Sequence, residues 1–151
     1  MSQIKYAAPY KIYKKNAAAQ FVTIKPKVED GKVAKEGAIL LEVAKAVGDK
    51  KYDWQGKISF ALGIQDLRQL FENLEKPPRL IHQTPESPLT KSLEFQPGEG
   101  RYEGTFMLKL AQKNASSNES DMIAVPLSAG EKEMLFRMMD KYSIYMLGWL
   151  E

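Results

Sequence analysis

The stretch KISFALGIQDLRQLFENLEKPP, residues 57–78, contains the change of hydrophobic period that decides the fold. Ile58, Phe60 and Leu62 are two residues apart, a spacing that places them on one face of a strand. From residue 64 the apolar residues recur at i, i+3, i+6, i+7 and i+10, which is one stripe of a helix. The prolines that close the stretch end this helix, because proline has no N–H and clashes with the preceding turn. The stretch predicts a strand followed by a helix at 64–74.

Strand patterns occupy most of the chain on both sides of that helix. Each is an apolar run of strand length or an alternation of apolar and polar residues, and the links are short and turn-like. EDGK (29–32) carries an Asp-Gly turn signal, and PGEGRYEG (97–104) begins as a turn. Tyr102 is expected on the same strand face as Phe106 and Leu108. The expected strands are 10–16, 19–25, 38–44 and 57–62 before the helix, and 79–83, 90–96, 102–113 and 121–127 after it.

A second helix is predicted to begin at a capping box near the end of the chain. Ser128 and Glu131 have S-x-x-E spacing, in which each side chain bonds to the backbone N–H of the other residue. An apolar stripe follows, formed by Leu135, Met138, Met139, Tyr142 and Met146. Four strands, a helix, four strands and a helix predict an α+β fold with β4-α-β4-α topology, in a single domain over residues 1–151.

The positive charge of the chain is concentrated in its first part. The net charge is +3, but residues 1–57 hold twelve lysines, no arginine and six acidic residues, which gives +6. A lysine-rich region of this kind indicates a face for an anionic partner such as nucleic acid. The alternative is a solvated strand surface whose lysines keep sheet edges from pairing with other chains.

Few residues suit catalysis or metal binding. The chain has no cysteine, which excludes disulfides and thiolate metal sites and fits a reducing compartment. Its one histidine, His82, supports a Ser-His-Asp array only if Asp66, Asp121 or Asp140 approaches it, and a packed or hydrogen-bonded histidine is the alternative. No P-loop or HExxH motif occurs. We therefore expect a protein that is not an enzyme, with no cofactor and no metal.

No targeting or membrane segment is recognised in the sequence. The first residues, MSQIKYAAPYKIYKK, lack the apolar core of a secretory signal and the Arg- and Ser-rich composition of a transit peptide. No run approaches the roughly 20 apolar residues of a membrane span. The expected location is cytoplasmic, in a bacterium, phage or similar source, with a mature organellar protein as the alternative.

Aromatic residues and lysines are interleaved around the first and fourth expected strands. Tyr13 is followed by Lys14 and Lys15, while Tyr52 and Trp54 lie close to Lys57. Flat rings that stack on bases, beside ammonium groups for the phosphates, are typical of sequence-tolerant binders of single strands. In continuous strand geometry, however, Tyr52 and Trp54 share a face with Ile58 and would simply extend the core to its rim. Both interpretations remain open at this point.

Five short sequences, in order, resemble motifs of the Whirly family of single-stranded DNA-binding proteins. The resemblance spans the chain from Tyr10 to Trp149, and the five sequences are YKKNAAA (13–19), YDWQGKISFAL (52–62), LIHQTP (80–85), LEFQPGEGRYEGTFMLKLAQKN (93–114) and LGW (147–149). The resemblance implies two antiparallel four-stranded sheets packed at an angle and held by two helices. It also implies a homotetramer with the helices at its centre. Lys15 and Asn16 replace a glycine and a lysine of the family signature. The change at Asn16 puts larger assemblies of tetramers in doubt, while Lys15 supplies a positive charge next to it.

The resemblance also implies a site and a function. Single-stranded DNA would lie along sheet edges and between subunits, bound with little sequence preference and protected during replication, recombination or repair. His82 matches a family histidine to which no role is assigned. The alternatives are an RNA-binding or annealing factor, since kinetoplastid guide-RNA-binding proteins share the fold, and an oligomeric protein-interaction module. The expected contacts are phosphate binding by Lys14, Lys15, Lys57, Lys109 and Lys113, base stacking by Tyr13, Tyr52 and Trp54, and hydrogen bonds from Asn16, Gln20, Gln112 and Asn114.

Overall fold

The computed structural model describes residues 7–150, and these residues form two large antiparallel sheets, a separate two-stranded hairpin and two α-helices. The first sheet consists of β1 (Tyr10–Tyr13), β2 (Ala17–Ile24), β5 (Ala38–Gly48), β6 (Lys51–Tyr52) and β7 (Ile58–Leu62). The second has the order β11-β10-β9-β8 and consists of β8 (Leu80–Gln83), β9 (Leu89–Pro97), β10 (Phe106–Asn114) and β11 (Glu119–Leu127). The helices are α1 (Ile64–Phe71) and α2 (Ala129–Met146). The predicted α+β fold of antiparallel sheets and two helices is confirmed, and the first sheet holds one strand more than predicted, the short β6.

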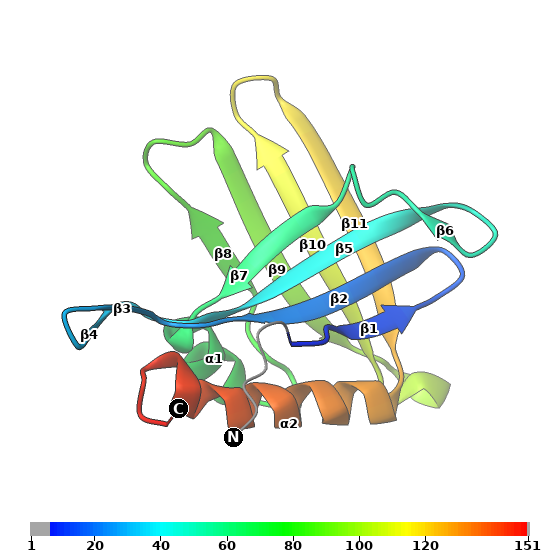
Figure 1. Cartoon of the computed structure of the whole chain (residues 1–151). Helices are drawn as coiled ribbons and strands as arrows, with labels where there is room; N and C mark the ends of the chain where they lie inside the picture. Colours follow the sequence, from blue (N-terminus) through cyan, green and yellow to red (C-terminus); the bar gives the residue numbers. More distant parts are fainter. Residues whose placement is uncertain (1–6, 151) are drawn as a thin grey trace.

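The core lies between the facing sides of the two sheets. Figure 1 shows the sheets crossing at an angle, with both helices beneath them at one end. Leu41 and Phe60 of the first sheet and Leu93, Leu108 and Leu110 of the second are at most 1% exposed. This burial follows from the alternation seen in the sequence, because every second side chain of a strand points to the same face.

Helix α2 closes the lower end of the core through one aromatic residue. The Phe136 ring centroid lies 5.3 Å from that of Phe95, 5.9 Å from that of Phe106 and 6.1 Å from that of Phe71. The helix therefore packs on the second sheet and on α1 at the same point. No helix in residues 7–150 is both long enough and apolar enough to cross a membrane.

One local prediction is confirmed and one is wrong where the chain turns sharply. The Asp-Gly signal marks a turn, as predicted: Asp30 and Gly31, with φ of 52° and 74°, form the turn of a separate hairpin, whose two short strands β3 (Lys27–Glu29) and β4 (Lys32–Lys35) were not predicted. Tyr102 lies in a 3₁₀ turn, η1 (Gly100–Tyr102), and is 55% exposed, so its predicted place on the buried strand face is wrong. The chain folds back so tightly here that a Cβ at Gly98 would lie 2.2 Å from the Tyr102 carbonyl oxygen.

The predicted capping box at the start of α2 is confirmed. Ser128 Oγ accepts a hydrogen bond from the Glu131 N–H at 3.1 Å, and Glu131 Oε1 accepts one from the Ser128 N–H at 2.9 Å. The same carboxylate accepts a hydrogen bond from Lys14 Nζ at 2.6 Å. Burial alone would raise the pKa of Glu131, but the bonds from Lys14 and Ser128 and the charge of Lys14 hold that pKa below its ordinary value of 4.5.

Removing the cap should therefore destabilise the fold in a pH-dependent way. Ser128→Ala should lower the free energy of unfolding by about 1 kcal/mol at pH 7. Because the folded-state pKa of Glu131 is depressed, its contribution is present above pH 4.5 and is lost as the pH falls through the folded-state value. Glu131→Gln should flatten this acid-side loss, as measured by urea unfolding between pH 3 and pH 7.

Glu133→Gln is the matched control on the same helix. Glu133 pairs with Arg137 one turn away, and both side chains are exposed, so the change should cost less than about 0.5 kcal/mol. Equal losses from Glu131→Gln and Glu133→Gln would contradict a special role for the capping carboxylate.

Candidate nucleic-acid interface

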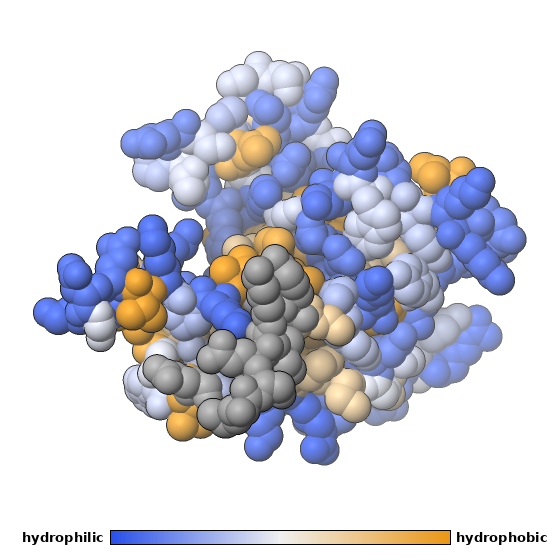
Figure 2. Space-filling model, viewed as in Figure 1, coloured by the Kyte–Doolittle hydropathy of each residue, from blue (hydrophilic) through white to orange (hydrophobic). Residues whose placement is uncertain are grey.

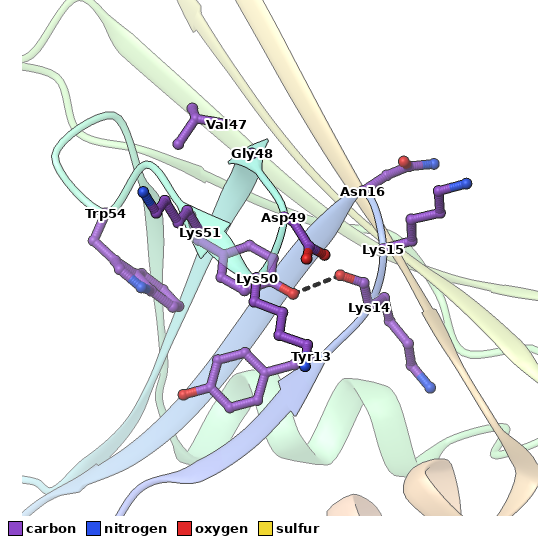
Figure 3. Close-up of a pocket in the computed structure, with 11 residues that line it drawn as sticks. Tyr13, Lys14, Lys15, Asn16, Val47, Gly48, Asp49, Lys50, Lys51 and Trp54 are labelled. Carbon is purple, nitrogen blue, oxygen red and sulfur yellow. Dashed lines mark hydrogen bonds between the residues drawn. The ribbon is translucent and has the colours of Figure 1, made fainter.

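Two neighbouring turns of the first sheet enclose a large hollow on the surface of the described residues. Figure 3 shows the turn between β1 and β2 beside the turn between β5 and β6, with their side chains around a cavity of about 1330 Å³. Three aromatic rings and four lysines line the cavity, together with one acidic residue. The lining residues are Tyr13, Lys14, Lys15, Asn16, Val47, Gly48, Asp49, Lys50, Lys51, Tyr52 and Trp54.

Strand register and two hydrogen bonds hold these turns together. Tyr13 pairs with Ala18 across β1 and β2, and Ala18 pairs with Ala44 across β2 and β5. The Ala46 N–H donates to the Asn16 carbonyl oxygen at 2.9 Å. The Tyr52 hydroxyl donates to the Lys14 carbonyl oxygen at 2.6 Å, which is the dashed bond in Figure 3. The hydroxyl of one predicted stacking residue thus fixes the turn that carries the predicted phosphate contacts.

Tyr13, Tyr52 and Trp54 form an aromatic group at the rim of this cavity. The Tyr13 and Tyr52 ring centroids are 5.5 Å apart with their planes tilted by 34°, and Tyr13 is 54% exposed. Trp54 is half-buried and lines the same cavity. None of the three belongs to the buried core cluster between the sheets.

The chain between Tyr52 and β7 explains why the rings do not extend the core. Residues 53–57 form a turn in which the Gly56 N–H donates to Asp53 Oδ1 at 3.1 Å. A Cβ at Gly56 would lie 2.5 Å from Asp53 Oδ2, so a side chain does not fit there without a shift. This turn interrupts the alternation that the sequence suggested. Tyr52 and Ile58 consequently do not share a face, which favours the interpretation of the rings as a platform.

Gln20 and Lys57 lie on the outer face of the same sheet and meet at a residue that sequence reasoning missed. Gln20 Nε2 donates to Glu42 Oε1 at 2.9 Å, and the Lys57 ammonium pairs with Glu42 Oε2. Burial by itself would raise the pKa of Glu42, but the hydrogen bonds from Lys57 and Gln20 and the charge of Lys57 leave that pKa below its ordinary value. The one signal in the sequence was an acidic residue inside the apolar run AILLEVA (38–44).

The four predicted residues of β10 are not brought to this cavity. Lys109 and Lys113 alternate along β10 with Leu108 and Leu110, so they lie on the outer face of the second sheet, while Gln112 and Asn114 follow the core-side alternation. The Asn114 Oδ1 accepts backbone N–H bonds from Ser116 and Ser117 at 2.9 and 3.2 Å and so holds the turn after β10. Gln112 and Lys113 line a separate hollow of about 580 Å³.

The lysines around the cavity differ in how far their charge is already balanced. Lys14 is paired with Glu131, whereas Lys15, Lys50 and Lys51 make no salt bridge within residues 7–150. Figure 2 shows strongly hydrophilic side chains over the end of the first sheet that carries β6. The motif YDW indicated the rings. Lys50 and Lys51, just before it in sequence, were not predicted as phosphate contacts, although they line the same cavity.

His82 has a structural position between the two sheets. Its ring stacks on Phe60 with the centroids 3.9 Å apart, and its Nε2 lies 2.9 and 3.0 Å from the two Asp66 carboxylate oxygens. Asp66 Oδ2 also accepts the Gly63 N–H at 2.9 Å, at the start of α1. The interpretation as a packed, hydrogen-bonded histidine is confirmed. Among the described residues no group of His, Asp and Glu is arranged to hold a metal ion.

Comparison with known proteins identifies relatives over nearly the whole chain. The family described as "Whirly transcription factor" matches residues 12–138. "Single-stranded DNA-binding protein WHY1, chloroplastic" of Zea mays is 29% identical over 93% of this chain and 56% of its own length. "Single-stranded DNA-binding protein WHY2, mitochondrial" of Arabidopsis thaliana is 24% identical over 94% of this chain and 63% of its own length. The chain thus spans somewhat over half the length of the curated relatives it matches.

Solved structures share the fold. The crystal structure of WHY1 from Arabidopsis thaliana superposes with a TM-score of 0.85 at 23% identity, covering 97% of this chain and 94% of that one. A more distant match, the structure of a guide-RNA-binding protein complex bound to a guide RNA, has a TM-score of 0.50 at 12% identity and covers 96% of this chain and 95% of that one. The predicted similarity to both groups is confirmed.

The relatives correct the predicted location. They are plant proteins described as chloroplastic or mitochondrial, so the expectation of a cytoplasmic protein from a bacterium, phage or similar source was wrong. Composition could not reveal this, because neither net charge nor cysteine content distinguishes an organellar protein from a cytoplasmic one. The family match covers most of the chain, the sheet topology agrees and the quoted motifs occur in order: the chain belongs to the Whirly family.

Proposed function

We propose that this chain binds single-stranded DNA largely without regard to sequence and protects it during replication, recombination or repair, without catalysing a reaction. The observation that carries the proposal is the cavity in which Tyr13, Tyr52 and Trp54 stand beside Lys15, Lys50 and Lys51. Rings stack on every type of base, and unpaired ammonium groups attract a phosphate backbone of any sequence. The names of the relatives, single-stranded DNA-binding proteins of plants, agree with the proposal.

The geometry favours a single strand over a duplex. The rings lie at the open end of a sheet, between two turns, where an unpaired base can insert flat. Reading a duplex commonly requires a helix or ribbon in the major groove. Both helices of this chain instead bury one side against the core, through Leu67 and Leu70 of α1 and through Leu135, Phe136 and Met139 of α2.

The proposed assembly is a homotetramer built around α2 and the residues after it. Several large apolar side chains there are exposed. Monomeric proteins rarely expose apolar patches of this kind, so the patch indicates an interface. Their exposed fractions are 50% for Met134, 36% for Met138, 38% for Tyr145, 73% for Trp149 and 51% for Leu150. Burial of this surface by other copies of the chain would leave the cavity at the far end of the first sheet open.

RNA is the second candidate ligand, because the fold matches that of a guide-RNA-binding complex. Rings and lysines do not distinguish the two sugars, and only a group that reads the 2′-hydroxyl would prefer RNA. An oligomeric protein-interaction module is the third candidate, supported by the same exposed methionines and aromatic residues on and after α2.

Titration with oligo-dT should quench tryptophan fluorescence and depend strongly on salt. The slope of log K against log salt should be about −0.7 for each phosphate contacted by a single strand. Replacing Lys50 and Lys51 together by Met should make the slope less steep by roughly 1.4. Lys32→Met, in the exposed hairpin away from the cavity, is the control and should leave the slope as it is. No quenching at low salt would rule out the proposed function, and tighter binding of matched RNA would assign the site to RNA.

Loss of a ring should weaken binding without changing the salt slope. Tyr13→Ala or Trp54→Ala should cost about 1–3 kcal/mol, which is the effect of losing one stacked base. Tyr52→Phe keeps the ring but removes the hydroxyl that bonds to the Lys14 carbonyl, and it should cause a smaller loss. Labelled-oligonucleotide anisotropy measures all three. Full affinity in both alanine variants would show that the rings do not stack on bases.

The mass in solution should be that of four chains. Light scattering should report a tetramer for the unmodified chain and smaller species for Met138→Asp, because a buried charge is costly at an apolar interface. Glu133→Gln, an exposed neutral change on the same helix, is the control. A monomer that still binds oligo-dT would refute the proposed assembly while leaving the binding function intact.

A further inference from the structure

A polar row crosses the outer face of the first sheet directly beside the aromatic group. The strand register aligns Lys11, Gln20, Glu42 and Ser59 across β1, β2, β5 and β7. The next row on the same face holds Tyr13, Ala18 and Ala44. Rows on one face are separated by two residues, which is about 7 Å. Gln20 is therefore a diagonal neighbour of Tyr13 on this face, at a separation of about 7–8 Å that the width of a stacked base can span.

Glu42 determines which way the Gln20 amide points. An ionised carboxylate only accepts hydrogen bonds, so Gln20 must turn its NH₂ group toward Glu42 Oε1, 2.9 Å away. Glu42 is 7% exposed, and its second oxygen is occupied by the Lys57 ammonium. The Gln20 carbonyl oxygen is consequently directed away from Glu42, and it accepts no side-chain hydrogen bond within residues 7–150.

We infer that the Gln20–Glu42–Lys57 cluster gives the site a preference for bases that carry an exocyclic amino group, namely cytosine, adenine and guanine, over thymine. The inference rests on the proposed binding of single strands and adds a base preference to it. The fixed amide oxygen accepts a hydrogen bond from an amino group such as N4 of cytosine. Thymine presents the O4 acceptor at that position, and its one donor, N3–H, lies one ring position further along the edge, so the base must shift on the stacked ring to satisfy the amide oxygen.

Lys57 neutralises the Glu42 carboxylate, so that this group does not repel a phosphate backbone. The ion pair between Lys57 and Glu42 balances the negative charge at the site, and the Lys57 side chain is 42% exposed. A bare carboxylate would repel the strand equally for every base. A neutral pair with a fixed amide, by contrast, changes the binding of one base relative to another. The result is a bias in composition on a platform that still accepts any sequence.

The test compares binding of oligo-dC and oligo-dT of equal length by anisotropy, at pH 8 where cytosine is neutral. The unmodified protein should bind oligo-dC about three- to tenfold more tightly, the effect of one hydrogen bond. Glu42→Gln should abolish this ratio, because the amide that replaces the carboxylate can donate as well as accept and no longer fixes the Gln20 side chain. Gln20→Met should abolish it too, and this change at a half-exposed position leaves the charge of the site as it is.

Asp49→Asn is the matched control for charge. Asp49 lines the cavity but lies outside the polar row, and its replacement also removes one negative charge. It should strengthen binding of both oligonucleotides equally and keep their ratio. A ratio near one in the unmodified protein, or a ratio that survives both Glu42→Gln and Gln20→Met, would overturn the inference. Failure to bind either oligonucleotide would instead refute the proposed function itself.

Discussion

The antiparallel pairing of β2 with β5, from Ala17 opposite Lys45 to Ile24 opposite Ala38, determines both sides of the first sheet at once. Its inner side chains, such as Phe21 and Leu41, enter the core, while Gln20 and Glu42 meet on the outer side. A slip of one residue would exchange the two sets, because side chains alternate strictly along a strand. Core burial thus holds the outer polar groups in register, and it brings the two lysine-bearing turns to the same end of the sheet.

The site and the proposed assembly surface are connected through α2. Lys14, in the turn beside the cavity, pairs with Glu131 in the first turn of the helix, although the two residues are 117 positions apart in sequence. Five residues further along the same helix, Phe136 packs against both α1 and the second sheet. The turn is therefore anchored from two directions, by Glu131 and by the Tyr52 hydroxyl. Such anchoring orders the turn before a strand binds, which reduces the entropy lost on binding.

Local patterns in the sequence were enough to predict most helices and strands. The contacts between segments that are distant in sequence could not be predicted in this way. The change of period before α1 and the Ser128–Glu131 box are encoded within a few residues, and both were predicted correctly. The position of Tyr102 depends on the tight backbone reversal around Gly98 and Gly100, which alternation does not report. At the site, motifs indicated the rings and Lys15. The partners of Gln20 and Lys57 are set by strand register, and the separation of the β10 residues from the cavity depends on which sheet carries them.

The turn of the β3–β4 hairpin stands apart from the rest of the described residues, with nothing within 4 Å of a Cβ placed at Gly31. In Figure 1 it projects from the opposite end of the first sheet to β6, and all of its residues are exposed. The side chains of this turn are exposed and do not pack against the core, so substitutions there are constrained only by the left-handed backbone at Asp30 and Gly31. A fluorophore or affinity tag attached at this tip would report on the protein from well outside both sheets. Immobilisation through this turn would leave the aromatic group of Tyr13, Tyr52 and Trp54, at the opposite end of the first sheet (Figure 1), facing solvent.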